Sequence, residues 1–131
     1  YAGFSTVEPW YTVNPNYSEV NVENALQDEN SIWYFYQRAM ALRKEYKDTA
    51  VYGQFKLYLP HDKQLFVYDK IAEDGKSKLT VVINLSAKPV RASKVAKYIP
   101  TDATELLSVY DEKWDRVLQP YSGKVFYSKL R

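Results

Sequence analysis

The spacing of apolar residues changes once along this chain of 131 residues, and that change constrains its fold most. Between residues 30 and 46, apolar side chains recur at steps of three and four, which predicts an amphipathic helix. The predicted apolar face consists of Ile32, Phe35, Tyr36, Ala39, Met40 and Leu42. After Asp48 the step becomes two, the period of a β-strand with one buried face. We therefore expect one long helix followed by a β domain.

The ends of this helix carry suitable residues. Asn30 or Asp28 can serve as the N-cap, because a side-chain oxygen can accept a hydrogen bond from a free amide of the first turn. Arg43 and Lys44 fall in the last turn, where positive charge interacts favourably with the helix dipole. A short helix is also expected within residues 20–28. Ahead of it, prolines and glycine predict an irregular loop over residues 1–21.

The rest of the chain alternates between apolar and polar residues. Phe55, Leu57 and Leu59 are predicted to face inward from one strand, and a second set of residues shares a face of another: Leu79, Val81, Ile83 and Leu85. The pair Asp74–Gly75 is typical of a hairpin turn. Five to seven strands with intervening turns predict an antiparallel sheet or small sandwich. The segments concerned are 54–60, 64–72, 77–86, 103–111, 116–121 and 123–130.

Composition argues against several classes of function. The net charge is only +2 and the lysines are scattered, so we expect no nucleic-acid partner. No apolar run approaches the roughly 20 residues of a membrane span. Zero cysteines and one histidine leave little to hold zinc. Four dispersed glycines provide no phosphate-binding loop, so neither a cofactor nor a metal is expected.

The sequence offers only weakly supported candidates for catalytic residues. His61 and Asp62 are adjacent in a predicted turn, but no serine lies in the sequence context of a nucleophile. Three carboxylates surround Trp114 in a stretch that resembles a polar loop between strands: Asp111, Glu112 and Asp115. Asn16 and Asn84 are each the first residue of a match to the short pattern for N-glycosylation. Asn84 lies within a predicted strand. We therefore predict no catalytic residue in this chain.

The aromatic content is high, with thirteen tyrosines and three tryptophans against five phenylalanines. Such rings suit half-buried strands, interfaces and sugar faces, because each combines an apolar face with a polar tip. Tyr58, Tyr68 and Tyr127 are expected to be exposed. These residues leave open an alternative function, that of a free-standing carbohydrate-binding or interaction module.

One stretch carries a specific resemblance. The segment "AGFS…PWYTVNPNYSEVNVENALQDENSI", followed by "YQRAMALRKEY", resembles the C-terminal part of the α-amylase-type glycoside hydrolases (family 13). It is most similar to oligo-1,6-glucosidases, maltases, dextran glucosidases and trehalose-6-phosphate hydrolases. Later segments continue the resemblance over essentially the whole chain: "YGQFKLYLPHDKQLFVYDK", "LTVVINLS", "ELLSVYD" and "LQPYSGKVF".

The resemblance implies a division of the chain. Residues 1–49 would be the end of a (β/α)8 catalytic barrel, comprising the loop after the eighth strand and the last barrel helix. Such loops lie on the catalytic face of barrel enzymes. Residues 50–131 would form the family's C-terminal antiparallel β-sandwich domain, packed beside the barrel. The family's three catalytic carboxylates lie upstream of this segment, so none is assigned here, and the substrate-binding residues stay unknown.

The expected function is therefore that of a non-catalytic C-terminal fragment of a cytoplasmic, retaining α-glucosidase acting on short α-1,6- or α-1,4-linked glucosides. Its partner would be the missing catalytic barrel, through which the parent enzyme meets its α-glucoside. The chain opens on Tyr1 rather than methionine, which predicts processing or a cut from a longer chain. The surface that the barrel would cover also predicts self-association of the isolated fragment.

Overall fold

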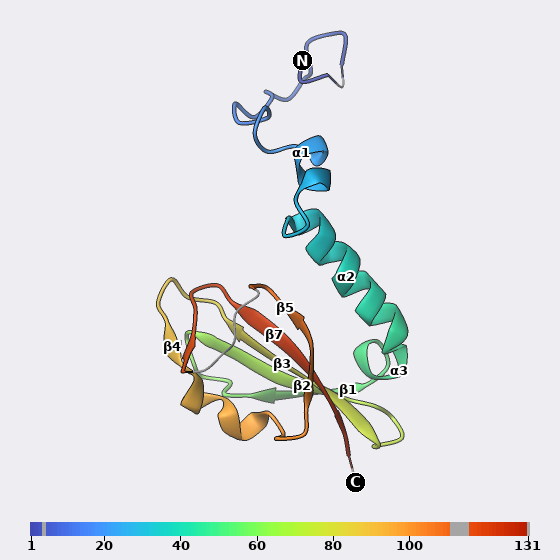
Figure 1. Ribbon diagram of the computed structural model, residues 1–131, viewed down its shortest axis with the longest axis vertical. Helices are drawn as coiled ribbons and strands as arrows, with labels where there is room; N and C mark the ends of the chain where they lie inside the picture. The colour runs from blue at the N-terminus through green and yellow to red at the C-terminus, as the bar shows by residue number, and fades with distance from the viewer. Residues whose placement is uncertain (4, 111–115, 131) are drawn as a thin grey trace. The chain divides into compact units, whose positions relative to one another are not determined.

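The computed structural model describes residues 1–3, 5–110 and 116–130. It divides into two compact units, residues 1–38 and 39–131. The first unit holds the N-terminal loop, a short helix and the start of a longer one, and the second holds the sheet (Figure 1). The predicted order of loop, helix and β domain is confirmed.

The first helix is the short one expected within residues 20–28. Helix α1 spans Val22–Gln27, and Asn21 is its N-cap. The Asn21 side chain accepts a hydrogen bond from the amide of Asn24 at 2.8 Å, which satisfies one of the free amides of the first turn. Before this helix, residues 1–3 and 5–20 form turns and bends without regular secondary structure.

Helix α2 spans Ile32–Glu45, with Arg43 and Lys44 in its last turn as predicted. The predicted N-cap is wrong. The amide of Phe35 donates to the carbonyl of Ser31 at 3.0 Å, which places Ser31 at the cap position. The carboxylate of Asp28 instead accepts from the amide of Asn30 at 2.9 Å. Asp28 and Asn30 therefore belong to the turn that precedes α2, and neither residue caps the N-terminus of the helix.

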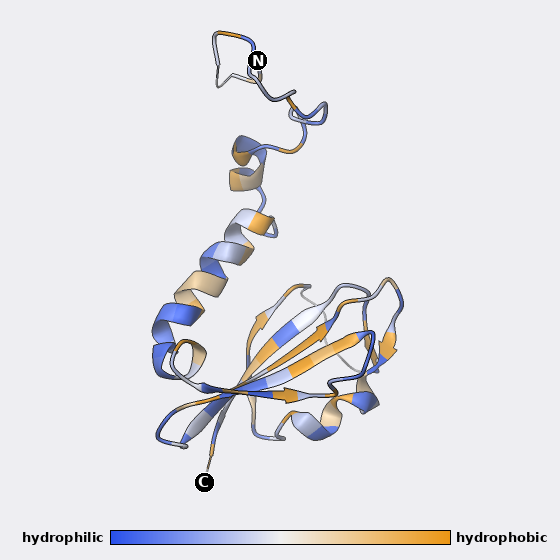
Figure 2. Cartoon of the chain, turned by 180° about the vertical axis from the view of Figure 1, so that it is seen from behind, coloured by the Kyte–Doolittle hydropathy of each residue, from blue (hydrophilic) through white to orange (hydrophobic). Residues whose placement is uncertain are grey.

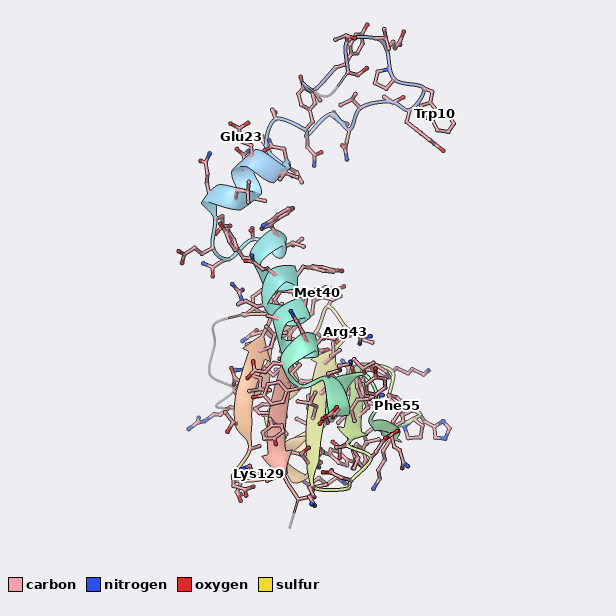
Figure 3. All side chains as sticks on the ribbon, turned by 90° about the vertical axis from the view of Figure 1, so that its right-hand side faces the viewer. Trp10, Glu23, Met40, Arg43, Phe55 and Lys129 are labelled. Atoms are coloured by element: carbon pink, nitrogen blue, oxygen red, sulfur yellow. The ribbon has the colours of Figure 1, made fainter. Side chains whose placement is uncertain are left out.

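The apolar face of α2 is only partly covered. No residue of this helix is buried, and Ile32 is 77% exposed. Tyr36 and Met40, one and two turns further on, are also exposed, and Figure 3 labels Met40 on the helix. The sequence pattern thus predicted the helix correctly, and its apolar face is half-buried at Phe35, Ala39 and Leu42.

A third helix, α3 (Lys47–Ala50), leads into the sheet and was not predicted. The chain then passes through Gly53, where backbone from two sides comes very close. A Cβ at this position would lie 2.3 Å from the carbonyl oxygen of Thr49 and 2.8 Å from that of Ile71. Only glycine avoids this clash, so Gly53 lets the chain turn directly from α3 into the first strand.

Five strands form one antiparallel sheet, as predicted, in the order β1-β2-β3-β7-β5 (Figure 1). They are β1 (Gln54–Tyr58), β2 (Leu65–Ile71), β3 (Ser77–Asn84), β5 (Thr104–Ser108) and β7 (Gly123–Lys129). The turn between β2 and β3 contains Gly75 with a positive φ of 68°, which confirms the predicted hairpin. The carboxylate of Asp74 accepts the amide of Lys76 there.

A smaller layer covers one face of the sheet. It contains the paired strands β4 (Val90–Arg91) and β6 (Val117–Leu118) and two 3-10 helices, Ala92–Lys94 and Ala96–Tyr98. The core between these layers is a cluster of buried aliphatic residues: Leu65, Val67, Val82, Val90, Val95 and Leu118. Figure 2 shows hydrophobic residues along the central strands and in β4.

The orientation predicted for β1 is wrong for Phe55 and Leu57, whereas Leu59, directly after the strand, packs against the core as expected. Phe55, which was expected to face inward, is 55% exposed, and Leu57 is exposed beside it. Tyr58 packs against the core instead, because its register partner on β2 is Val67, a residue of the buried cluster. Since side chains alternate along a strand, Phe55 and Leu57 then lie on the opposite face of the sheet. We call this face the outer face.

The outer face is also apolar. In β3 the residues Leu79, Val81 and Ile83 share it, as their spacing predicts, because Val81 pairs with Tyr68 and Tyr68 with Leu57. Leu85, which was expected to continue this row, lies beyond the end of β3 and is exposed. The sheet thus has two apolar faces, and the smaller layer covers only one of them.

Candidate functional site

The adjacent His61 and Asp62 do not form a catalytic pair. Both lie in the turn between β1 and β2, and His61 is exposed. Asp62 accepts the backbone amides of Gln64 and Leu65 at 2.8 and 2.9 Å. These backbone hydrogen bonds hold the pKa of the Asp62 carboxyl below its usual value. Asp62 therefore stabilises the turn, and His61 is a solvated turn residue, the interpretation that its sequence context favoured.

The second set of candidate carboxylates, Asp111, Glu112 and Asp115 around Trp114, lies outside the described residues. A different carboxylate, which the sequence did not single out, is buried. Asp69 on β2 is only 1% exposed. It accepts hydrogen bonds from the Tyr58 hydroxyl at 2.8 Å, the Lys78 ammonium at 2.8 Å and the Thr80 hydroxyl at 2.7 Å.

This buried cluster is a structural feature. Both carboxylate oxygens of Asp69 are occupied by partners within the sheet, and the charge of Lys78 compensates that of the carboxylate. Burial, followed by the hydrogen bond to Asp69, raises the pKa of Tyr58 to about 12. The tyrosine is therefore held in its neutral, donating form. The sequence pattern of β1, β2 and β3 did not indicate that Asp69 and its three hydrogen-bond donors would come together.

The two matches to the glycosylation pattern differ in their surroundings. Asn16 is exposed in the N-terminal loop. Asn84 is fully buried, and its amide donates to the carbonyls of Lys88 and Gln119 at 2.8 and 3.0 Å. Its side-chain oxygen accepts from the hydroxyl of Ser86. Asn84 therefore ties the end of β3 to the smaller layer and is unavailable for modification in the folded chain.

The aromatic residues that suggested a binding module are not exposed as expected. Tyr58, Tyr68 and Tyr127 are all half-buried. The ring of Tyr58 lies 4.6 Å from that of Tyr98, and the ring of Tyr127 lies 5.0 Å from that of Tyr46. The prediction failed because their neighbours come from distant segments of the chain. Exposed rings occur elsewhere, above all in the N-terminal loop.

The N-terminal loop borders an open hollow of about 510 Å³, and most of the residues that line it are exposed to solvent. Trp10 and Tyr11 form one wall, with ring centroids 4.6 Å apart and planes inclined by 59°. Figure 3 shows Trp10 at an outer bend of this loop, with its side chain pointing away from the ribbon. The remaining lining residues are uncharged: Ala2, Pro9, Thr12, Val13, Asn14, Tyr17 and Asn21.

A second, smaller depression of about 250 Å³ lies in the other unit, beside the β2–β3 turn. Its lining includes the acidic residues Asp48, Glu73 and Asp74. Over residues 1–3, 5–110 and 116–130, no group of three or more His, Asp or Glu side chains is placed to hold a metal ion. Within the same residues, no helix combines the length and apolar character needed to cross a bilayer.

Comparison with known proteins identifies relatives of the whole chain. Residues 1–53 match the family described as "Alpha amylase, catalytic domain". An α-glucosidase of Candida albicans is 39% identical over 126 residues, which cover 96% of this chain and 21% of the relative. An oligo-1,6-glucosidase of Halalkalibacterium halodurans is 38% identical over 134 residues, covering 98% of this chain and 23% of the relative.

Solved structures show the same relationship. A trehalose-6-phosphate hydrolase of Bacillus licheniformis superposes with a TM-score of 0.78 at 33% identity, over 96% of this chain and 23% of that one. An isomaltulose synthase of Klebsiella sp. LX3 superposes with a TM-score of 0.78 at 26% identity, over 99% and 23% respectively. This chain thus spans between a fifth and a quarter of the length of these proteins. Its residues 1–53 match the α-amylase family, and nearly its whole length is similar to α-glucosidases and oligo-1,6-glucosidases.

Proposed function

We propose that this chain is a non-catalytic part of a longer retaining α-glucosidase that acts on short α-1,6- or α-1,4-linked glucosides. The observation that carries the proposal is coverage: relatives named α-glucosidase and oligo-1,6-glucosidase match 96–98% of this chain but only 21–23% of themselves. A retaining glycosidase needs two carboxyl groups about 5 Å apart across the scissile bond. In this proposal they lie in the portion of the enzyme outside this chain.

Within such an enzyme, residues 1–49 would be the end of the catalytic barrel and residues 50–131 a β-sandwich domain beside it. The match of residues 1–53 to the catalytic-domain family supports this division. The exposed residues Ile32, Tyr36 and Met40 of α2 support it as well, since a last barrel helix buries such residues against its neighbours in the barrel. Cytoplasmic location stays a prediction.

The outer face of the sheet is the surface we assign to the missing barrel. Three aromatic rings meet there: the Tyr68 ring lies 5.0 Å from that of Phe55 and 5.1 Å from that of Phe66. Phe55, Leu57 and Phe66 are exposed. A contiguous apolar patch of this kind rarely stays bare on a protein that functions alone. The β domain would thus stabilise the barrel by covering apolar surface.

Two assays test this proposal. The purified chain should release no glucose from maltose, isomaltose or trehalose 6-phosphate, and measurable release would overturn the non-catalytic assignment.

When co-expressed with a Halalkalibacterium halodurans oligo-1,6-glucosidase truncated by the corresponding segment, the chain should restore glucosidase activity. Phe55→Lys should reduce that rescue, whereas Tyr121→Lys, at an exposed position outside the outer face, should leave it intact. Absence of rescue by the unmodified chain would count against the assignment.

A further inference from the structure

Strand β1 forms one open edge of the sheet. It pairs with β2 on one side only, and outside that pairing its amides and carbonyls form no backbone hydrogen bond with the described residues. Alternate residues of such a strand direct both groups away from the sheet, where another strand can pair with them. We propose that β1 pairs antiparallel with β1 of a second copy of this chain, centred on Lys56, so that the two sheets become continuous. This pairing does not depend on the proposed function.

The main chain of β1 suits such a pairing better than the opposite edge of the sheet does. The five residues Gln54–Tyr58 pair with β2 in unbroken register. The other edge strand, β5, has a register shift between Glu105 and Leu107. A bulge of this kind bends an edge strand and places its main-chain groups out of line for a further strand. Of the two edges, β1 is therefore the one that can accept a partner along its whole length.

The side chains of β1 are complementary to those of a second copy. In a two-fold antiparallel pair centred on Lys56, Phe55 of each copy lies opposite Leu57 of the other copy on the outer face. Phe55 is 55% exposed and Leu57 is 41% exposed in the single chain. The pairing would remove both from water twice, once on each side of the two-fold axis. The Tyr68 ring, 5.0 Å from that of Phe55, continues the apolar row within each copy.

The central lysine does not prevent this pairing. Like charges directly opposite each other on neighbouring strands are destabilising. The Nζ of Lys56, however, lies over the ring of Tyr58, 5.3 Å from its centre, so the side chain leans along its own strand and away from the axis. The two-fold symmetry sends the two ammonium groups in opposite directions, to a separation of about 13 Å. At physiological ionic strength this exceeds the Debye length of about 8 Å, so the repulsion is screened.

The contact lies in the plane of the sheet, which distinguishes it from association through the outer face. Five residues of strand extend over about 17 Å, and a contact of this size is smaller than the interfaces of permanent complexes. We therefore expect a weak, reversible dimer. A covalent bond that traps the dimer is the most sensitive test of its register.

Single cysteines report the register, because the chain contains no cysteine of its own. A disulfide needs Cα atoms within about 7 Å of each other. In the proposed pair, position 55 lies opposite position 57 of the other copy, whereas the two copies of position 55 are about 8 Å apart, as are those of position 57. A mixture of Phe55→Cys and Leu57→Cys chains should therefore cross-link in air at least about tenfold faster than either variant alone. Lys56→Cys, on the axis, should cross-link by itself.

Three further variants serve as controls. Tyr121→Cys, at an exposed position outside β1, gives the rate of chance collisions. Thr104→Cys reports on the bulged edge strand β5, and both of these variants should cross-link slowly. Phe66→Lys weakens association through the outer face and, introduced into both cysteine variants, should leave the mixed cross-link in place. Each variant should keep the circular dichroism spectrum of the unmodified chain.

The pattern of cross-links decides between this pairing and other contacts. Equal rates for the mixture and for either variant alone would overturn the proposed register. Loss of the mixed cross-link in the Phe66→Lys background would assign the contact to the outer face instead. Hydrogen exchange provides a test without substitutions: amides of β1 should exchange more slowly as the concentration of the unmodified chain rises, whereas those of β5 should not. Exchange in β1 that is independent of concentration would overturn the proposal.

Discussion

Individual residues on the covered face of the sheet show how a polar group is tolerated in a small core. Asp69 is nearly inaccessible to solvent, but it accepts hydrogen bonds from three side chains. One donor, Tyr58, lies on β1, and the other two, Lys78 and Thr80, lie on β3. A buried carboxylate without such partners would be strongly destabilising. The cluster therefore joins three neighbouring strands through one charged group.

Tyr58 makes this cluster sensitive to alkaline pH. Its pKa is raised from 10.0 to about 12 in the folded chain, so the folded state holds the phenol proton more tightly than the unfolded state does. The contribution of Tyr58 is complete below pH 10, and it is lost as pH rises to about 12. We expect the free energy of unfolding to fall over this interval. Urea denaturation across the interval measures the fall.

Tyr58→Phe is the control, because it removes the titrating hydroxyl and keeps the ring against Tyr98. This variant should lose stability at neutral pH, since Asp69 loses one of its donors. Between pH 10 and 12 its stability should fall less steeply than that of the unmodified chain. If the free energy of unfolding of the two proteins fell equally steeply with pH, groups other than Tyr58 would be responsible for the loss of stability at alkaline pH.

At the scale of elements, the helix and the sheet differ in how much they depend on packing within the chain. Residues of α2 are not buried, whereas Val67 of β2 is fully buried in the core. Ile32→Glu should therefore change the free energy of unfolding by less than about 0.5 kcal/mol. Val67→Ala should cost about 2 kcal/mol, because it leaves a cavity that the sheet cannot close. Chemical denaturation of both variants measures the contrast, and a large loss for Ile32→Glu would show that this face is covered in solution.

At the scale of the whole molecule, the outer face of the sheet governs solution behaviour. An isolated chain that exposes Phe55, Leu57 and Phe66 on one surface should self-associate as its concentration rises. Light scattering measures the mean mass. Phe66→Lys should lower it toward that of a monomer, since a charge in the patch is costly to bury, whereas Tyr121→Lys should not. A monomer at all concentrations would contradict the prediction.

The periodicity of the sequence was sufficient for helix α2, for the five strands of the main sheet and for their order, whereas α3, β4 and the two 3-10 helices were not predicted. Repeats of three and four residues predicted α2, and alternation with an Asp–Gly turn predicted β2, β3 and the hairpin between them. The N-terminal motif around Pro9 to Tyr17 was distinctive enough to identify the family by resemblance. These features are local, so each can be recognised within a short window of sequence.

The pairing of strands across the sheet determined features that the local sequence pattern could not predict. The alternation of β1 is equally compatible with either face inward, and the register that sets Tyr58 opposite Val67 chose the one not predicted. Asp69 gained its partners, and Asn84 its carbonyls, from strands and loops far away in sequence. Sequence alone determined the long helix, the five strands of the main sheet and the resemblance to the α-amylase family, whereas the tertiary structure decided which faces are buried and which residues meet, because both depend on contacts between distant segments.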